Sequence, residues 1–302
     1  MWYNKERKEE FLHYRNEDAI ISTNVSTAFD QAAFFEEKLG VDICDWNSTQ
    51  IISFLKYLST PKIQTLIATV NHLKIYTDWC ISNHLSEDYQ NHFCEISSKI
   101  MCQCIDYNKF EHLIIKNRED LLRDLATLPN YSDRYIFLAT YEGIPRADII
   151  EGRFDDFDEG NSTLKVGDNV YEISADLCQI IVGASEQNDF TSNVNQDRVY
   201  PYINDGHILR FARKSHVKGS GNRINLYDRR FRECASYMGW NPQLTIKDLA
   251  ESGRMDFIRK IMKENNLSAE AAVKAPWREV HQKKYGKVQN IYTYMETYGK
   301  YI

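Results

Sequence analysis

The stretch from Tyr131 to Ser174, YSDRYIFLATYEGIPRADIIEGRFDDFDEGNSTLKVGDNVYEIS, decides the fold of this chain. Its apolar first part predicts a helix that reaches Gly143, and a second short helix is expected directly after it. Two strands are expected at Thr163–Val166 and Val170–Ile173, turned by Gly167-Asp168-Asn169. The predicted order is therefore helix, short helix and β-hairpin.

The first half of the chain is predicted to be a bundle of short helices. FDQAAFFEEKLG indicates one helix with Gly40 as its stop. NSTQIISFLKYL indicates a second helix with Ser48 or Thr49 as its N-cap. A longer apolar-periodic helix follows, and residues 186–196 in the second half are predicted to form a polar loop. We expect a mainly α protein with a helical domain at 1–120 and a second domain at 128–302.

The helix, Gly143-Ile144-Pro145-Arg146 step and hairpin resemble the start of the catalytic domain of tyrosine recombinases (phage integrases). The helices at 47–85 are similar to that family's core-binding domain. The YEGI step also resembles a group of lysis–lysogeny repressors from SPβ-like Bacillus prophages. The resemblance implies an N-terminal core-binding-like domain and a C-terminal catalytic-fold domain with a small sheet.

The same resemblance implies that the catalytic chemistry is lost. A working recombinase clamps one phosphate with two arginines, a hairpin lysine and histidines, while a tyrosine attacks the phosphorus. The first arginine falls on Pro145, or on Arg146 after a one-residue slip, and Lys165 is the candidate for the hairpin lysine. Lys247 replaces the histidine of the His-x-x-Arg box and Ala250 its arginine. The candidate nucleophiles are Tyr292, Tyr294, Tyr298 and Tyr301, and without the arginines we predict no enzymatic activity.

Charge is unevenly distributed along a chain whose net charge is −6. Residues 147–197 are strongly acidic, whereas 207–232 are basic, and DNA affinity depends on such local phosphate neutralisation rather than on total charge. The alternative is a solvated helix face, which normally mixes both signs. The predicted DNA-binding residues are Arg146, Arg210, Arg213, Lys214, Lys218, Arg223, Arg229, Arg230 and Lys247, with Arg232 in the same basic segment.

Composition excludes several other classes of protein. Apolar runs are too short for a membrane span, and the charged N-terminus does not have the pattern of a signal peptide, so the cytoplasm of a bacterial host is expected. Seven cysteines at irregular spacings argue against a disulfide framework. Cys94, Cys102, Cys104 and His112 do not have the paired spacing of a zinc site, and the acidic turn at 155–159 is interpreted as solvated. No metal or cofactor is predicted.

Three hypotheses for function remain. The first is a sequence-specific transcriptional repressor of phage lytic genes that binds double-stranded operator DNA, relieved by a protein or peptide anti-repressor. The second is an active integrase with relocated groups, namely Arg146, Lys165 and a C-terminal tyrosine. The third is a helical module that binds protein through the acidic segment 148–197. We favour the first, with the choice between monomer and dimer open.

Overall fold

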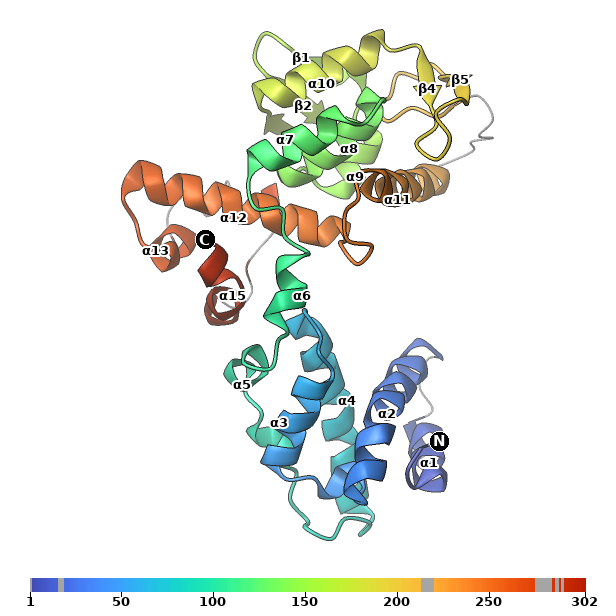
Figure 1. Cartoon of the computed structure of the whole chain (residues 1–302), viewed down its shortest axis with the longest axis vertical. Helices are drawn as coiled ribbons and strands as arrows, with labels where there is room; N and C mark the ends of the chain where they lie inside the picture. The colour runs from blue at the N-terminus through green and yellow to red at the C-terminus, as the bar shows by residue number, and fades with distance from the viewer. Residues whose placement is uncertain (1, 16–18, 213–219, 275–283, 286–287, 289–290) are drawn as a thin grey trace. The chain divides into compact units, whose positions relative to one another are not determined.

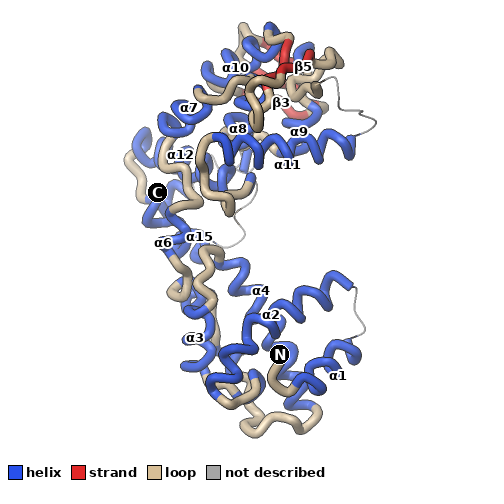
Figure 2. The backbone as a smooth tube through the Cα atoms, turned by 45° about the vertical axis from the view of Figure 1, so that its right-hand side comes forward, coloured by secondary structure: helices blue, strands red, loops and turns tan. Residues whose placement is uncertain are grey.

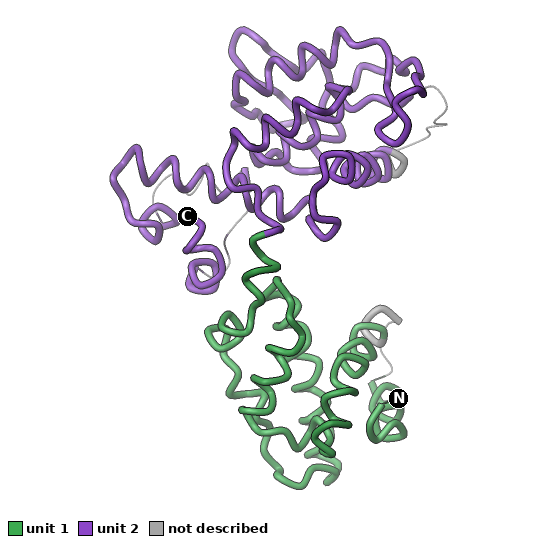
Figure 3. The backbone as a smooth tube through the Cα atoms, viewed as in Figure 1, with its two compact units in different colours: residues 1–111 green, residues 112–302 purple. Residues whose placement is uncertain are grey.

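The computed structural model describes residues 2–15, 19–212, 220–274, 284–285, 288 and 291–302. Arg213, Lys214 and Lys218, which the sequence places in the basic segment, lie outside these residues. The chain divides into two compact units, residues 1–111 and 112–302, drawn in different colours in Figure 3. Each unit has its own apolar core, so each is considered by itself.

Unit 1 is helical throughout its described part. Two of its helices are long, α2 and α4, and they pack side by side (Figure 1). The helices are α1 (Lys5–Arg15), α2 (Ala19–Leu39), α3 (Ser48–Tyr57), α4 (Ile63–Ser82), α5 (Ser98–Cys102) and α6 (Tyr107–Glu111), with short 3-10 turns η1 (Ile43–Asp45) and η2 (His92–Glu95).

The ends of these helices follow from local chemistry. Gly40 follows α2 at φ +67°, a left-handed conformation that suits glycine, as the sequence predicts. The predicted cap of α3 was wrong by one or two residues, because Asn47 is the N-cap. Its side chain accepts from the Gln50 backbone N–H, and the Gln50 side chain accepts from the Asn47 N–H. This reciprocal pair satisfies two donors that the first turn of a helix leaves open.

Aromatic side chains fill the core of unit 1. The Phe11 ring of α1 lies edge-on to Phe29 of α2 and to Tyr76 of α4, with ring centroids 6.1 and 5.3 Å apart. Trp46 and Phe54 form a second contact at 5.2 Å. Because such pairs add to the free energy of area burial, the three helices are held together by one aromatic cluster.

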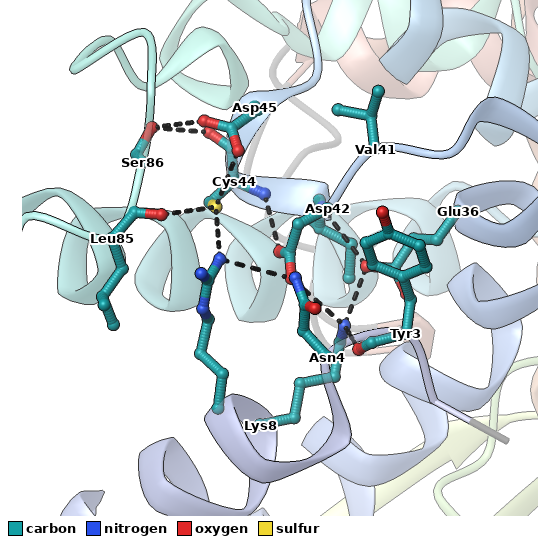
Figure 4. A network of polar contacts seen from close by, with 12 residues as sticks. Tyr3, Asn4, Lys8, Glu36, Val41, Asp42, Cys44, Asp45, Leu85 and Ser86 are labelled. Carbon is teal, nitrogen blue, oxygen red and sulfur yellow. Dashed lines mark hydrogen bonds and ion pairs between the residues drawn. The ribbon is translucent and has the colours of Figure 1, made fainter.

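A buried network of charges joins α1 to the rest of unit 1 (Figure 4). The Lys8 Nζ lies 2.8 Å from Glu36 Oε1 and 3.7 Å from Asp42 Oδ2, and neither Lys8 nor Glu36 has any exposed side-chain surface. Tyr76 donates to Asp42 from the other side. Burial raises the pKa of Glu36 to about 7, although Lys8 acts in the opposite direction.

Unit 2 combines helices with two small antiparallel sheets (Figure 2). Its helices are α7 (Arg118–Ala126), α8 (Tyr131–Tyr141), α9 (Arg146–Glu151), α10 (Ala175–Glu186), α11 (Ser220–Tyr237), α12 (Ile246–Asn265), α13 (Ala269–Lys274) and α15 (Ile291–Tyr298), with 3-10 turns η3 (Phe154–Asp156) and η4 (Gly299–Tyr301). The strands are β1 (Phe157–Asp158), β2 (Thr163–Val166), β3 (Asn169–Glu172), β4 (Asp189–Thr191) and β5 (Val199–Pro201).

The predicted hairpin is present with a shorter turn. Val166 pairs with Asn169, so the turn is Gly167-Asp168 rather than three residues, and β3 begins one residue earlier than predicted. Gly167 has φ +58°, which a two-residue hairpin turn requires at its first position. The prediction of a loop at 186–196 was wrong in part, since this segment contains β4, which pairs with β5. The strand was missed because a short polar strand has no apolar alternation to identify it.

Helix α8 is the centre of unit 2. Its residues from Tyr135 to Tyr141 are all buried, and it packs against α10, α11 and α12. Gly253 of α12 sets the closest approach, because a Cβ there would lie 1.7 Å from the Tyr141 carbonyl oxygen. Gly143 ends α8 at φ +83°, against Lys284 and Tyr285. The end of α8 is therefore fixed by close contacts that only glycine permits.

A second, smaller apolar cluster joins the end of α12 to α13 and α15. Its buried members are Ile258, Ala272, Val273 and Tyr294. None of the helices in the described ranges is both long enough and apolar enough to cross a membrane.

Candidate nucleic-acid interface

The α8–α9 step carries the position predicted for the first arginine. Pro145 is the N-cap of α9, and Arg146 is the first residue of that helix. The Arg146 guanidinium lies 2.6 Å from Asp228 of α11 and 5.5 Å from the centroid of the Tyr227 ring. The side chain is 40% exposed, so the ion pair is open to solvent on one side. The charge of Arg146 is directed at a carboxylate of the protein itself.

The first turns of α12 carry the positions predicted for the histidine and second arginine. Thr245 and Asp248 form a capping box at the start of α12. Lys247 is exposed and Ala250 is half-buried. A methyl group at Ala250 supplies neither a charge nor a hydrogen-bond donor to a phosphate.

One arginine lies a helical turn beyond Ala250. Arg254 is 7% exposed, and its Nη1 lies 3.2 Å from Glu251 Oε1. It also donates to the Tyr285 carbonyl oxygen, and the Tyr294 ring centroid is 5.8 Å from its guanidinium carbon. Burial raises the pKa of Glu251, while Arg254 and Lys247 act to lower it. Arg254 thus holds residues of the C-terminal segment to α12.

The candidate tyrosines differ in their surroundings. Tyr294 is 6% exposed, and burial raises the pKa of its hydroxyl well above the ordinary value. Burial also raises the pKa of Tyr298. Tyr292 is 76% exposed on the other face of α15, and Tyr301 lies half-buried in η4. A buried phenol with a raised pKa is a poor nucleophile, because its ionised form is disfavoured.

The hairpin lysine candidate lies in β2, as the sequence predicts. Lys165 is exposed and pairs with Val170, which is itself 62% exposed. The hairpin is tied to α9 through Asp148, which accepts from Asn169 and from the Tyr171 hydroxyl. Lys165 therefore lies on the outer face of a hairpin whose position relative to α9 is fixed.

Three of the predicted DNA-binding arginines are buried. Arg230 of α11 has 2% of its side chain exposed and lies 2.6 Å from Asp133 Oδ1, while its guanidinium carbon lies 3.7 Å from the Phe190 ring centroid. Asn130 and Asn193 donate to the other oxygen of Asp133. Burial acts to lower the pKa of Arg230, but Asp133 more than offsets it and the pKa is raised.

Arg210 and Arg223 are used in the same way. Arg210 donates to the carbonyl oxygens of Ala184 and Gln187. Arg223 donates to the Leu209 carbonyl oxygen at 3.0 Å and pairs with Asp205. These two side chains and Arg230 bind carbonyl oxygens and carboxylates inside unit 2, so they are not part of the interface proposed below. For Arg223 and Arg230 a sequence signal was available, because they share the helical spacing of the apolar residues of α11, namely Leu226, Tyr227, Phe231 and Cys234.

The outer face of α11 keeps two exposed arginines. Arg229 is 53% exposed, with Glu233 at 3.8 Å, and Arg232 is exposed with its Nε donating to the Asp228 carbonyl oxygen. Arg229 and Arg232 are three residues apart, so they are neighbours on the helix surface. Within the described part of the basic segment, Arg229 and Arg232 are the arginines exposed to solvent.

Unit 1 contains a surface that the sequence prediction missed. An open groove of about 370 Å³ lies between α2 and α4. Its walls carry amide and hydroxyl groups, one imidazole and no carboxylate. The residues are Asn24, Thr27, Ala28 and Gln31 from α2, with Gln64, Thr65, Ala68, Thr69 and His72 from α4. Neutral side chains that both donate and accept hydrogen bonds are the types that read base edges in DNA. Their helical spacing on α2 and α4 was the only sequence signal.

Within the described residues no cluster of His, Cys, Asp or Glu is placed to hold a metal ion. All seven cysteines are free thiols, and Cys94 alone among them is exposed.

Known proteins match both units. The family model of the N-terminal core-binding domain of MrpR matches residues 1–82, and that of the C-terminal catalytic domain of MrpR matches residues 116–283. The SPbeta prophage-derived uncharacterized protein YopR of Bacillus subtilis (strain 168) is 25% identical over 142 residues, which are 47% of this chain and 42% of that protein. The chain therefore matches less than half the length of this relative.

Two solved structures also match over most of the chain, at low similarity. One is a lambda integrase (75-356) dimer bound to a COC′ core site, with TM-score 0.41 and 12% identity, covering 96% of this chain and 98% of the other. The other is XerA recombinase, with TM-score 0.38 and 11% identity over 99% and 98% of the two chains.

The two units define the class of the protein: a core-binding domain followed by a catalytic-type domain, as in tyrosine-recombinase-like (integrase-like) proteins. Within this class the chain belongs to the MrpR family, whose two domain models together match most of its length. The resemblance inferred from the sequence is thereby confirmed, as is the mainly α fold with its small sheets.

Proposed function

We propose that this protein is a sequence-specific repressor that binds operator DNA near phage lytic genes and performs no strand transfer. The prophage origin of its relative YopR supports the phage context. The partner is double-stranded DNA in the cytoplasm of the bacterial host. The protein needs no cofactor for this function, because binding requires only phosphate and base contacts.

The proposal rests on what the arginines contact at the positions that correspond to the catalytic residues of recombinases. Pro145 and Ala250 supply no charge, and the two arginines beside them, Arg146 and Arg254, each face a carboxylate of the protein. A phosphoryl-transfer pocket needs donors that are aimed at the reacting phosphate before it arrives. Arginines that already neutralise Asp228 and Glu251 do not meet this requirement.

Two surfaces are suited to hold DNA without that pocket. The outer face of α11, with Arg229 and Arg232, and the exposed Lys247 of α12 are assigned to phosphates, which position a protein on the duplex. The groove between α2 and α4 is assigned to base edges, because its amides and hydroxyls match the donors and acceptors of the major groove. The DNA would be bound electrostatically and read through uncharged groups.

A nicked suicide substrate tests the absence of strand transfer. A recombinase traps its tyrosine on such DNA as a covalent adduct that survives denaturing electrophoresis. We expect retarded DNA on a native gel and no adduct on a denaturing gel. A covalent adduct that disappears when Tyr292, Tyr294, Tyr298 or Tyr301 is replaced by phenylalanine would instead establish an active recombinase. No retardation at any salt concentration would reject DNA binding itself.

A further inference from the structure

An exposed aromatic pair lies on unit 1. Phe34 of α2 is 56% exposed and Tyr57 of α3 is 50% exposed. Their rings are stacked, with centroids 5.6 Å apart and planes 21° apart. Single exposed apolar residues are ordinary, but two stacked rings form a flat and rigid apolar surface.

The aromatic pair continues the α2 wall of the groove. Successive helical residues are rotated by about 100°, so Thr27, Gln31 and Phe34 lie on one stripe that spans about 60° of the helix surface. Lys38 continues the same stripe one turn further and is exposed. Thr27 and Gln31 line the groove itself. The wall therefore runs from hydroxyl and amide groups to an aromatic ring and then to a positive charge.

The chemistry of this wall selects among ligands. The groove lining contains no carboxylate, although the chain has 43 acidic residues and a net charge of −6. The lining itself adds no negative charge that would repel a polyanion. Lys38 lies at the end of the stripe, and the exposed Asp30 and Glu37 flank Phe34 on the α2 surface. Within a duplex the bases are stacked, so their faces are covered and only their edges can be reached. The C5-methyl of thymine is the apolar group on the major-groove edges.

We propose that the Phe34–Tyr57 pair contacts the C5-methyl of a thymine in the operator, adjacent to the bases read by the groove. This assignment rests on the proposed function, because it takes the groove between α2 and α4 as the base-reading surface. It makes Phe34 a specificity-determining residue for a T·A pair. The aromatic surface is thereby removed from water in the complex, which favours the bound state.

Replacing thymine by deoxyuridine removes the methyl group and leaves every hydrogen-bonding group of the base unchanged. The test is a scan of single T-to-dU substitutions across a footprinted operator, with Kd measured for the wild type and for Phe34→Ala. For the wild type we expect one or two positions at which dU weakens binding about fourfold, the effect of one buried methyl-sized group. In Phe34→Ala the T and dU operators should bind equally at those positions.

Two further variants serve as controls. Tyr14→Ala removes an aromatic ring that is 71% exposed on α1, and it should keep the wild-type preference for T over dU. Phe34→Leu keeps an apolar side chain and should retain part of it. Because Phe34 and Tyr14 are exposed, all variants should melt within a few degrees of the wild type.

The outcomes separate this inference from the proposed function. A wild type that binds the operator but shows no dU effect at any position overturns the thymine contact and leaves the repressor intact. A dU effect that persists in Phe34→Ala also overturns it and moves the contact to another side chain. If Phe34→Ala changes the binding of DNA and of no protein, a protein-docking role for the two rings has no support. A wild type that binds no DNA overturns both.

Discussion

The catalytic position of unit 2 and the groove of unit 1 differ in what their polar side chains do. At the catalytic positions of unit 2, Arg146 and Arg254 neutralise Asp228 and Glu251. Pro145 and Ala250 carry no charge, and Lys165 and Lys247 are exposed. In the groove the amides and hydroxyls face an open space of about 370 Å³. The comparison teaches that residue type alone does not locate a functional surface. The same cation can clamp a ligand or stabilise the fold, and the position of its carboxylate partner decides which.

The largest effect should come from breaking the contact that holds the catalytic position. In Gly253→Ala the new Cβ would lie 1.7 Å from the Tyr141 carbonyl oxygen, so α12 must move away from α8. We expect a loss of more than about 3 kcal/mol in the free energy of unfolding, or no folded protein, measured by urea denaturation. The control is Gly160→Ala, where the nearest contact is an ordinary 3.5 Å. Equal stability of the two variants would contradict the close crossing.

Two adjacent arginines of α11 allow a buried arginine with a structural role to be compared with an exposed arginine that is assigned to DNA. Arg230→Ala leaves Asp133 buried without its cation, which should cost about 3–5 kcal/mol of stability. Arg229→Ala removes an exposed side chain and should change stability by less than about 0.5 kcal/mol.

DNA binding should separate the same pair. Arg229→Ala should reduce the slope of log Kd against log salt concentration by about 1, the effect of one lost phosphate contact. Native gel retardation between low and physiological salt measures this slope. An unchanged slope would remove α11 from the interface, and a stable Arg230→Ala variant would contradict its structural role.

Sequence patterns were sufficient to predict local structure, but they did not predict the partners of the charged side chains. The α8 helix, the Gly143 turn and the β2–β3 hairpin depend on neighbouring residues, and each was predicted. Arg230 was assigned to DNA from the basic segment around it. Its ion pair with Asp133 could not be predicted, because the two residues are 97 apart in the chain. The groove was missed because its two walls come from separate helices and carry no charge to attract notice.

The last prediction concerns the pH dependence of stability and a carboxyl group on the buried face of α2, the helix that carries one wall of the groove. Glu36 lies on α2 against Lys8, Asp42 and the Ile43 backbone N–H. Its pKa is raised from 4.5 to about 7 mainly by burial, so the folded state binds the proton more tightly than the unfolded state. The stabilisation from this proton is complete below about pH 4.5 and is lost as the pH rises through about 7, at most about 3 kcal/mol.

Glu36→Gln should flatten this part of the pH profile of unfolding measured between pH 5 and 8. His92 contributes in the same direction, because the hydrogen bonds that its ring donates to Asp88 and Glu95 raise its pKa, but it is present in both proteins and cancels in the comparison. Glu37→Gln, at the exposed neighbouring position, is the matched control and should keep the wild-type profile. Parallel profiles for wild type and Glu36→Gln would contradict the raised pKa.

The central claim is that this scaffold binds operators and leaves the DNA strands intact. Footprinting of the purified protein on DNA from its own genome, read on a denaturing gel at several salt concentrations, tests both parts together. The account predicts discrete protected sites near promoters, protection that weakens with salt, and no strand breaks. A single protected attachment-like site with a nick and protein covalently joined to the DNA would contradict it.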